Sequence, residues 1–533
     1  MWSPFLSTYC VLAATCVRYV AGYSCDCSGS CVASTTTGTY RGVQDLEGVH
    51  FLSIRYAKPP VDSLRFADPD PFVPEQNVTY DASSLPPFCI QYTTYQSEDC
   101  LFLNVFLPDY YGKETPLPVM FWIHGGSILV GGTADPTIYG AKLAKAKNMI
   151  VVTVQYRLGL LGLFDDGSNT NFAVKDLILA LKWVKNNIAN FNGDPCLIAI
   201  AGQSSGATMI RALMSTTQTA GMFTRAILMS DPMDYGFNKR STSVNLITGM
   251  IYNATGCSNI ACMRSLSLTD ILAAQAAVVS NGHSTYPEIN YAQPFSPVID
   301  STLIKKDFST YVEKGNLPIQ VSMIAGTVAD EGNSHIEDIL SSPVSVAYYP
   351  TILAEFLGVK RAGLLLARGE FVPDPAVDDS TRLELAFVGK LFYWTCAVQR
   401  LALSYFSNMS KKVYIYETEV GITYPADASL VLCQGSYVCH EADIEPLFGT
   451  YNSSAVTAAQ IAVSHEVQER WYQFIKTGDP NSRSYTYWKP LKSAFKLNLL
   501  KIGKSKVASS HYPQTCSSIF GRLVNFDYQL YSQ

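Results

Sequence analysis

Short apolar runs alternate with helical patterns through the middle of this chain, and this alternation constrains its possible folds more than any other feature. Runs rich in β-branched or small apolar residues occupy positions 119–123, 150–154, 197–201, 226–229 and 321–325. Apolar side chains recur every three or four residues over 175–188, which predicts a helix. This order is typical of the α/β class, in which helices cover both faces of a large, mostly parallel sheet. Functional groups in such sheets lie on loops at the carboxyl ends of the strands.

The composition is that of a globular protein with no preference for polyanionic partners. Hydrophobic residues make up 48% of the 533 residues and charged residues 16%, a balance that excludes a disordered chain. The net charge is -5 and no long basic run occurs, which argues against nucleic acid and anionic membrane surfaces as partners. We find no repeat or linker, and we predict a single domain over residues 34–533.

The N-terminal segment predicts a secreted, extracellular protein. Residues 5–17 are apolar apart from small polar residues, and Ala21 and Gly22 supply a small-residue cleavage site, so residues 1–22 are predicted to be a signal peptide. No Lys or Arg precedes the apolar stretch, and Arg18 follows it. The alternative is a membrane anchor, but a membrane span needs about 20 apolar residues. No C-terminal apolar tail suggests a lipid anchor.

Cysteines and glycosylation sequons agree with that location. Of the 14 cysteines, Cys10 and Cys16 would leave with the signal peptide, so an even number would remain to pair in an oxidising compartment. Sequons for N-glycosylation occur at Asn77, Asn253, Asn408 and Asn452. The cluster of Cys25, Cys27 and Cys31 is open to bridges within itself or to Cys196.

The pentapeptide Gly202-Gln203-Ser204-Ser205-Gly206 supplies a candidate nucleophile. It follows the predicted strand at 197–201 and precedes a helical pattern. A sharp strand-to-helix turn leaves no room for a Cβ at either flank and holds the serine hydroxyl at the helix N-terminus. The pentapeptide alone also arises by chance or in structural turns, whereas its position between a strand and a helix favours catalysis.

A serine hydroxyl needs a base to remove its proton and donors to stabilise the oxyanion that forms on attack. The predicted strand at 119–123 ends in His124-Gly125-Gly126-Ser127, which resembles the glycine-rich oxyanion loop of lipases and esterases. The alternative is an ordinary glycine turn.

These residues resemble the type-B carboxylesterase/lipase family of α/β-hydrolases, which includes cholinesterases and fungal secreted esterases and lipases. The match runs from about Gly38 to Cys516. The segments 51–60, 64–66 and 97–105 are similar to the family's N-terminal and second signatures, and further matches follow in family order at 156–159, Asn171, Asp176, 191–195 and 478–481.

The resemblance implies a Ser–Glu–His triad and backbone oxyanion donors. Ala329-Asp330-Glu331-Gly332 resembles the acid motif, which assigns Glu331 as the acid with Asp330 as its rival. Cys439-His440-Glu441 resembles the histidine loop, which makes His440 the base. The expected oxyanion donors are the N–H groups of Gly126, Ser127 and Ser205, with Ser127 in place of the family's usual glycine. His124 is expected to be structural, and His465 to face the core or solvent.

The resemblance also implies structural pairs. Disulfides are expected between Cys89 and Cys100, Cys257 and Cys262, and Cys396 and Cys516, and proximity alone suggests Cys433 with Cys439. Arg65 with Glu98, and Arg157 with Asp176, look like the family's internal ion pairs. No cofactor and no metal are expected.

Two departures from the family pattern bear on the substrate. The ten residues between Cys89 and Cys100 include no Trp, and Gln203 replaces the family's acidic residue before the nucleophile, so choline esters are disfavoured. Such a short loop cannot form a lipase lid. We therefore expect a secreted serine esterase for short or medium-chain soluble esters. The alternatives are a triacylglycerol lipase with a lid elsewhere, within residues 340–390, and an inactive esterase-like binding protein. The oligomeric state is left open.

Overall fold

A continuous sheet of 14 strands runs through the computed structural model, which describes residues 22–523 apart from 26–28, 109–114, 233–235, 287–288, 290–292, 423–429, 505 and 512. Seven consecutive strands of this sheet are parallel, in the spatial order β8 (Ile150–Val154), β7 (Leu117–Ile123), β9 (Gly193–Gln203), β10 (Arg225–Met229), β13 (Ser322–Val328), β14 (Val413–Thr418) and β15 (Lys496–Ile502). They include all five apolar runs, and the fold class predicted from the sequence is confirmed.

The two edges of the sheet are antiparallel, which the sequence analysis did not predict. On one side lie β1 (Tyr23–Cys25), β2 (Ser30–Thr35), β3 (Gly38–Asp45), β4 (Gly48–Arg55) and β6 (Phe102–Leu107), and on the other lies β16 (Lys506–His511). The short β5 (Thr79–Asp81) is an exception, because it pairs with β3 in parallel. β2 and β3 include partly buried and exposed residues, so their apolar signal is weaker than that of the central strands.

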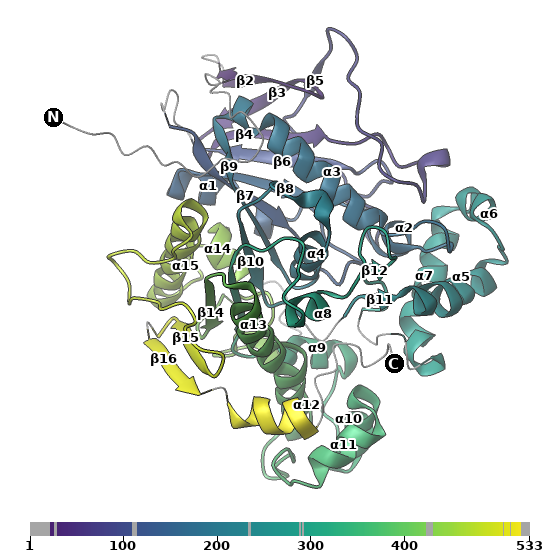
Figure 1. The fold of residues 1–533 in the computed structure, drawn as a ribbon, viewed down its shortest axis with the longest axis vertical. Coiled ribbons are helices and arrows are strands. Elements are labelled where there is room, and N and C mark those ends of the chain that lie inside the picture. The colour runs from purple at the N-terminus through teal and green to yellow at the C-terminus, as the bar shows by residue number, and fades with distance from the viewer. Residues whose placement is uncertain are drawn as a thin grey trace.

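Both faces of the central sheet are buried, because alternate residues of one strand point into different hydrophobic clusters. In β7, Val119, Phe121 and Ile123 belong to the larger cluster, whereas Met120 and Trp122 belong to the smaller one. The larger cluster includes side chains of α3 (Phe172–Asn187), α4 (Ser205–Met214) and α13 (Cys396–Met409); the smaller includes those of α1 (Ala141–Lys147) and α15 (Ala458–Thr477). Figure 1 shows α1 and α15 on one side of the sheet and α3 and α4 on the other.

Smaller helices extend beyond the two layers. One group comprises α5 (Thr248–Thr255), α6 (Ile260–Ser265) and α7 (Leu268–Thr285); another comprises α9 (Gly332–Ile339), α10 (Tyr349–Leu357), α11 (Val359–Leu366) and α12 (Ser380–Gly389). In Figure 1, α10 and α11 project from the lower end of the molecule. Across the described ranges, no helix has both the length and the apolar character that a membrane crossing would require.

Five disulfides join described cysteines. They are the three pairs implied by the family resemblance, the Cys433–Cys439 pair suggested by proximity, and a Cys25–Cys31 bridge between β1 and β2. Cys27 lies outside the described residues, as does the predicted signal peptide up to residue 21. All four sequon asparagines are exposed.

Candidate active site

Ser204 lies on the sharp turn between β9 and α4. Its backbone is strained, with φ 54° and ψ -129°, and its N–H donates to the carbonyl of Met229 on β10 at 2.9 Å. A Cβ at Gly202 would lie 2.8 Å, and one at Gly206 only 2.2 Å, from the carbonyl oxygen of Ile123. Both glycines are therefore required by the close approach of β7, which brings the loop after β7 next to Ser204.

His440 meets Glu331 at this edge of the sheet. Glu331 follows β13 and begins α9, and its Oε2 lies 2.5 Å from His440 Nδ1, with both side chains buried. When Glu331 is ionised it can only accept, so Nδ1 of the neutral imidazole carries the proton of this hydrogen bond. Nε2 then keeps the lone pair that a base needs.

Asp330, the rival acid, has a different contact. Its Oδ2 accepts from the Val438 N–H at 2.8 Å, and its own N–H donates to the Val438 carbonyl at 2.9 Å. A disulfide from Cys439 to Cys433 anchors the same loop directly before His440. Asp330 thus ties the histidine loop to the end of β13, whereas Glu331 contacts the imidazole.

Burial shapes the protonation of this pair. It raises the pKa of Glu331, which the hydrogen bond from the Val328 N–H opposes, and it lowers the pKa of His440. The rings of His335 and Trp394 pack against His440 at centroid distances of 5.0 and 5.4 Å and exclude water from one side.

The loop after β7 passes close to Ser204, because a Cβ at Gly125 would lie 3.1 Å from the Ser204 Cβ. Gly126 has φ 100° and Ser127 has φ 56°, so Ser127 occupies a left-handed conformation that glycine adopts more easily. Within the described ranges, the N–H groups of Gly126 and Ser127 donate to no protein acceptor. The Ile128 N–H donates to the Ser205 hydroxyl at 3.0 Å, which pins the loop to the start of α4.

His124 has a structural role in this loop. Its Nδ1 lies 2.9 Å from the Gly125 carbonyl oxygen, its ring stacks on Tyr156 at 4.6 Å, and burial lowers its pKa to about 4. His465 is exposed on α15.

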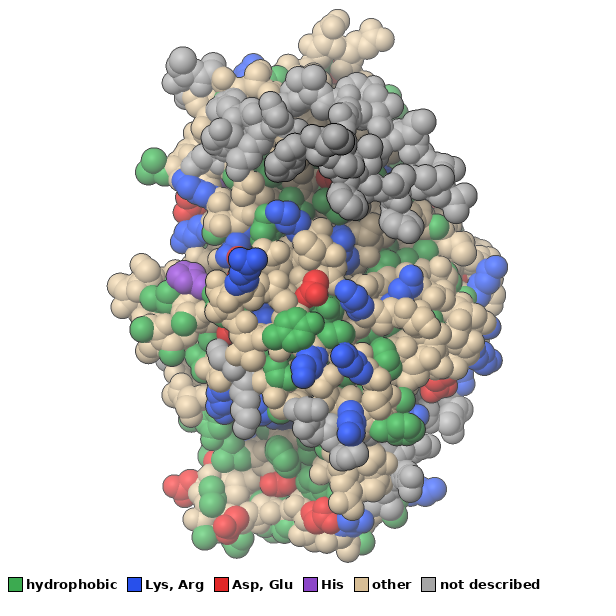
Figure 2. Space-filling view, turned by 60° about the vertical axis from the view of Figure 1, so that its left-hand side comes forward, with side chains coloured by type: hydrophobic (Ala, Val, Ile, Leu, Met, Phe, Trp, Pro, Cys, Tyr) green, Lys and Arg blue, Asp and Glu red, His purple; other side chains and the backbone are tan. Residues whose placement is uncertain are grey.

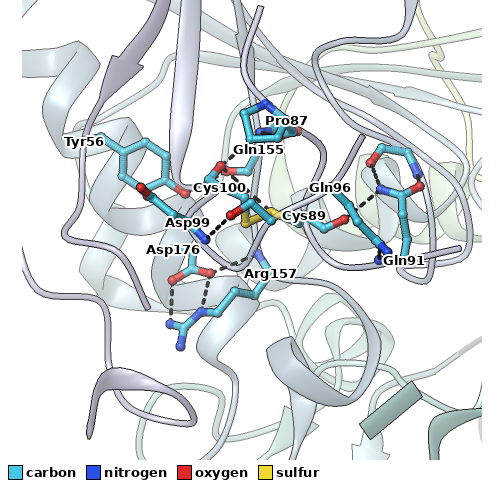
Figure 3. The surroundings of a disulfide bond; sticks show 12 residues. Tyr56, Pro87, Cys89, Gln91, Gln96, Asp99, Cys100, Gln155, Arg157 and Asp176 are labelled. Carbon is cyan, nitrogen blue, oxygen red and sulfur yellow. Dashed lines mark hydrogen bonds and ion pairs between the residues drawn. A yellow bond between two sulfur atoms is a disulfide. The ribbon is translucent and has the colours of Figure 1, made fainter. Parts of the chain in front are cut away.

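The loop closed by the Cys89–Cys100 disulfide is hydrogen-bonded to its neighbours, and Figure 3 shows the surroundings of this disulfide. Gln155 donates to the carbonyls of Pro87 and Cys100 at its base. Gln91 donates to the Gly131 carbonyl at 2.8 Å and accepts from the Gly131 N–H at 3.0 Å. Nothing in the sequence signals this contact, because it joins two loops 40 residues apart.

The two expected ion pairs form. Arg65 donates to both carboxylate oxygens of Glu98, at 2.6 and 2.5 Å, and Arg157 to those of Asp176, at 2.8 and 2.6 Å. Arg157 and Asp176 lie just below the disulfide in Figure 3 and are buried. A bidentate pair of this kind holds its loops in one geometry.

Two cavities flank the catalytic candidates. A cleft of about 380 Å³ is lined by the oxyanion loop, Gln91, Gln203 and the acidic side chains of Asp135 and Glu441. Burial, reinforced by the charge of Asp135, raises the pKa of Glu441 to about 7. On the other side of His440, a narrow apolar cavity of about 40 Å³ lies among α9, α10 and α12. Across the described ranges, no three His, Cys, Asp or Glu side chains are placed to hold a metal ion.

A serine on the turn after a central parallel strand, in this doubly covered sheet, defines the class of the protein as an α/β-hydrolase. Residues 30–519 match the carboxylesterase family. The chain is 29% identical to carboxylesterase 1C of Rattus norvegicus, over 86% of this chain and 87% of the relative, and 30% identical to carboxylesterase 4A of Bos taurus, over 86% and 88%. The solved structure of a PNB esterase superposes with a TM-score of 0.75 at 25% identity, covering 91% of this chain and 98% of that one.

The chain belongs to the carboxylesterase family and is a carboxylic ester hydrolase. The alternative of an inactive binding protein loses its support with that assignment. The family acts on small-molecule esters.

Proposed function

We propose that this esterase works through an acyl-enzyme formed on Ser204. His440 Nε2 takes the hydroxyl proton as Ser204 Oγ bonds to the carbonyl carbon, and the carbonyl oxygen becomes an oxyanion. The N–H groups of Gly126, Ser127 and Ser205 stabilise that charge. The carbon–oxygen bond to the alcohol then breaks, and His440 returns the proton to the departing oxygen. Water repeats the sequence and releases the carboxylic acid.

The short contact between Glu331 and His440 carries this proposal. Both groups are buried, and the loops that hold them are joined by Asp330 and Val438 beside the Ser204 turn. A carboxylate placed there stabilises the imidazolium that forms when His440 takes a proton.

The deciding test is Ser204→Ala with p-nitrophenyl butyrate as substrate. Loss of a triad serine lowers turnover on the order of a million-fold. The variant should keep the thermal transition of the parent, because the change removes one hydroxyl and fills no space. Undiminished turnover in the folded variant would overturn the assignment.

The geometry favours short or medium acyl chains. The apolar cavity of about 40 Å³ is narrow, and its walls include Leu353, Phe356 and Leu357. The loop closed by Cys89–Cys100 is too short and too well held to act as a lid. Soluble esters therefore fit the site as it stands better than bulk triglyceride does.

A second candidate function, a triacylglycerol lipase, is favoured by one observation. Large apolar side chains are exposed along the segment 340–390, including Tyr348 at 63%, Val359 at 80% and Val372 at 51%. The same segment forms walls of the apolar cavity, and hydrophobic side chains are visible at the lower end of the molecule in Figure 2. A lid that opens at a lipid surface needs such residues.

An acyl-chain series from acetate to palmitate, measured below and above the solubility limit, separates the two candidates. The esterase should show its highest kcat/KM with short or medium esters and no rate increase when the substrate becomes insoluble. A rate jump at the interface would favour the lipase.

We infer that the mature protein is secreted as a single glycosylated domain. A signal peptide over residues 1–22, the disulfides and four exposed sequon asparagines support this. In a eukaryotic host, the protein should reach the medium with its N-terminus near residue 23 and lose mass on enzymatic deglycosylation. A retained protein that begins at Met1 would contradict the inference.

A further inference from the structure

Gln203 contacts the face of His440 from which a base must act. The carboxamide Nε2 of Gln203 lies 3.1 Å from His440 Nε2, and the Gln203 side chain is fully buried. Because His440 Nδ1 carries the proton donated to Glu331, Nε2 has a lone pair, and the amide N–H donates to it. Among the described residues, no hydrogen bond joins Ser204 Oγ to His440.

The surrounding structure leaves space for this carboxamide. A Cβ at Gly125 would lie 2.8 Å from Gln203 Oε1, so the glycine of the oxyanion loop makes room for it. The Oε1 atom has no hydrogen-bond partner in the described part of the chain. A half-turn of the amide would therefore let Oε1 accept from the protonated Nε2–H of His440. The only hydrogen bond lost is the one from Gln203 Nε2–H to His440 Nε2, which protonation of the imidazole removes in any case.

The charge around the imidazole is sparse. Among the described residues, Glu331 is the only carboxylate that forms a hydrogen bond or an ion pair with His440. His335, which faces the ring from α9, stays neutral because burial lowers its pKa to about 3. Further titratable groups interact electrostatically with Glu331. They are Lys390 on η7 (Lys390–Thr395), Tyr416 on β14, and Asp330, Glu441 and Asp443 on the adjoining loops.

We propose that Gln203 is a positioning residue. Its amide N–H occupies the Nε2 lone pair of the resting imidazole, releases it when the Ser204 hydroxyl takes its place, and the amide then turns over to accept from the imidazolium. Because Gln203 is uncharged, the Glu331–His440 pair stays active at more acid pH than it would with a carboxylate at position 203. This inference rests on the proposed function, since it assigns His440 as the base. The glutamine at position 203, where the family has an acidic residue, would therefore extend the activity of the enzyme to more acid pH.

The test compares Gln203→Glu with Gln203→Leu. A carboxylate within hydrogen-bonding distance favours the protonated imidazole, so the acid limb of kcat/KM should move upward by about one to three pH units in Gln203→Glu. Gln203→Leu keeps a similar volume and removes the amide, so its kcat should fall about five- to tenfold with KM unchanged. Gln218→Glu adds the same charge at an exposed position after α4 and should leave the profile unmoved.

Release of butyrate, quantified by chromatography, gives a rate at every pH. The inference would be overturned if the acid limb of the kcat/KM profile of Gln203→Glu coincided with that of the parent. It would also be overturned if Gln203→Leu raised KM and left kcat unchanged, because that pattern assigns Gln203 to substrate binding.

A second measurement does not depend on turnover. In the Ser204→Ala background, the imidazole nitrogen shifts of His440 followed by NMR should show the same upward movement when Gln203→Glu is added. If the parent protein hydrolysed no ester, the proposed function would fall while this titration still tested Gln203. If the parent were active and the titration were unmoved, the Gln203 inference alone would fall.

Discussion

Replacing Glu331 with Gln tests which of two adjacent acids serves His440. The Glu331 carboxylate contacts His440 Nδ1 at 2.5 Å and is completely buried, so no water can replace it. A glutamine amide can turn its N–H toward Nδ1, which then holds the imidazole in the tautomer that has no lone pair at Nε2. In other triads the wrong tautomer lowers turnover on the order of 10⁴-fold. At about 1.4 kcal/mol per factor of ten, the expected rise in the activation free energy is about 5 kcal/mol.

Asp330→Asn is the matched control at the next position. It removes the same charge, but an asparagine oxygen can still accept from the Val438 N–H that Asp330 now binds at 2.8 Å. Its turnover should stay within about tenfold of the parent value, since a neutral hydrogen bond replaces one to a charged group. Both variants would be assayed for kcat with p-nitrophenyl butyrate, and their melting temperatures compared. A Glu331→Gln enzyme with more than a tenth of parental turnover, or an equal loss in Asp330→Asn, would refute the reasoning.

Further variants test packing around the site. Gly206→Ala should destabilise the protein by about 3 kcal/mol or more, because its Cβ would lie 2.2 Å from the Ile123 carbonyl oxygen. Gly249→Ala in α5 meets no atom within 4 Å and should stabilise the protein by about 0.5–1 kcal/mol. Denaturant unfolding measures both changes, and equal effects would contradict the Cβ argument. Loss of the Cys396–Cys516 bridge, which spans 120 residues, should lower the free energy of unfolding by about 5 kcal/mol. Loss of Cys433–Cys439, which spans 6 residues, should lower it by only about 2 kcal/mol. The second loss should nevertheless lower kcat more, because it frees the loop that carries His440. Leu353→Ala should enlarge the apolar cavity and raise the rate with octanoate relative to butyrate, and an unchanged ratio would show that the acyl chain lies elsewhere.

Local features of the sequence were sufficient to predict the central sheet and the position of Ser204. The run at 150–154 coincides with β8, because a strand buried on both faces needs apolar residues at every position. The pentapeptide around Ser204 depends only on the strand before it, the helix after it and two glycines, all of which are consecutive in the chain. The antiparallel edges escaped prediction, because β2 and β3 bury only some of their residues and carry no regular pattern.

What the tertiary structure alone decided is how distant groups meet. The family resemblance assigns Glu331 as the acid with Asp330 as its rival, and the fold shows that Glu331 contacts His440 whereas Asp330 binds the backbone of the histidine loop. The contact of Gln203 with His440 joins residues 237 positions apart, and that of Gln91 with Gly131 joins two loops. Such contacts depend on the register of whole strands and on close packing, which no local pattern encodes. The sequence by itself therefore predicted the fold class, the ester chemistry and a turn at Ser204, whereas the tertiary structure decided which side chains contact His440.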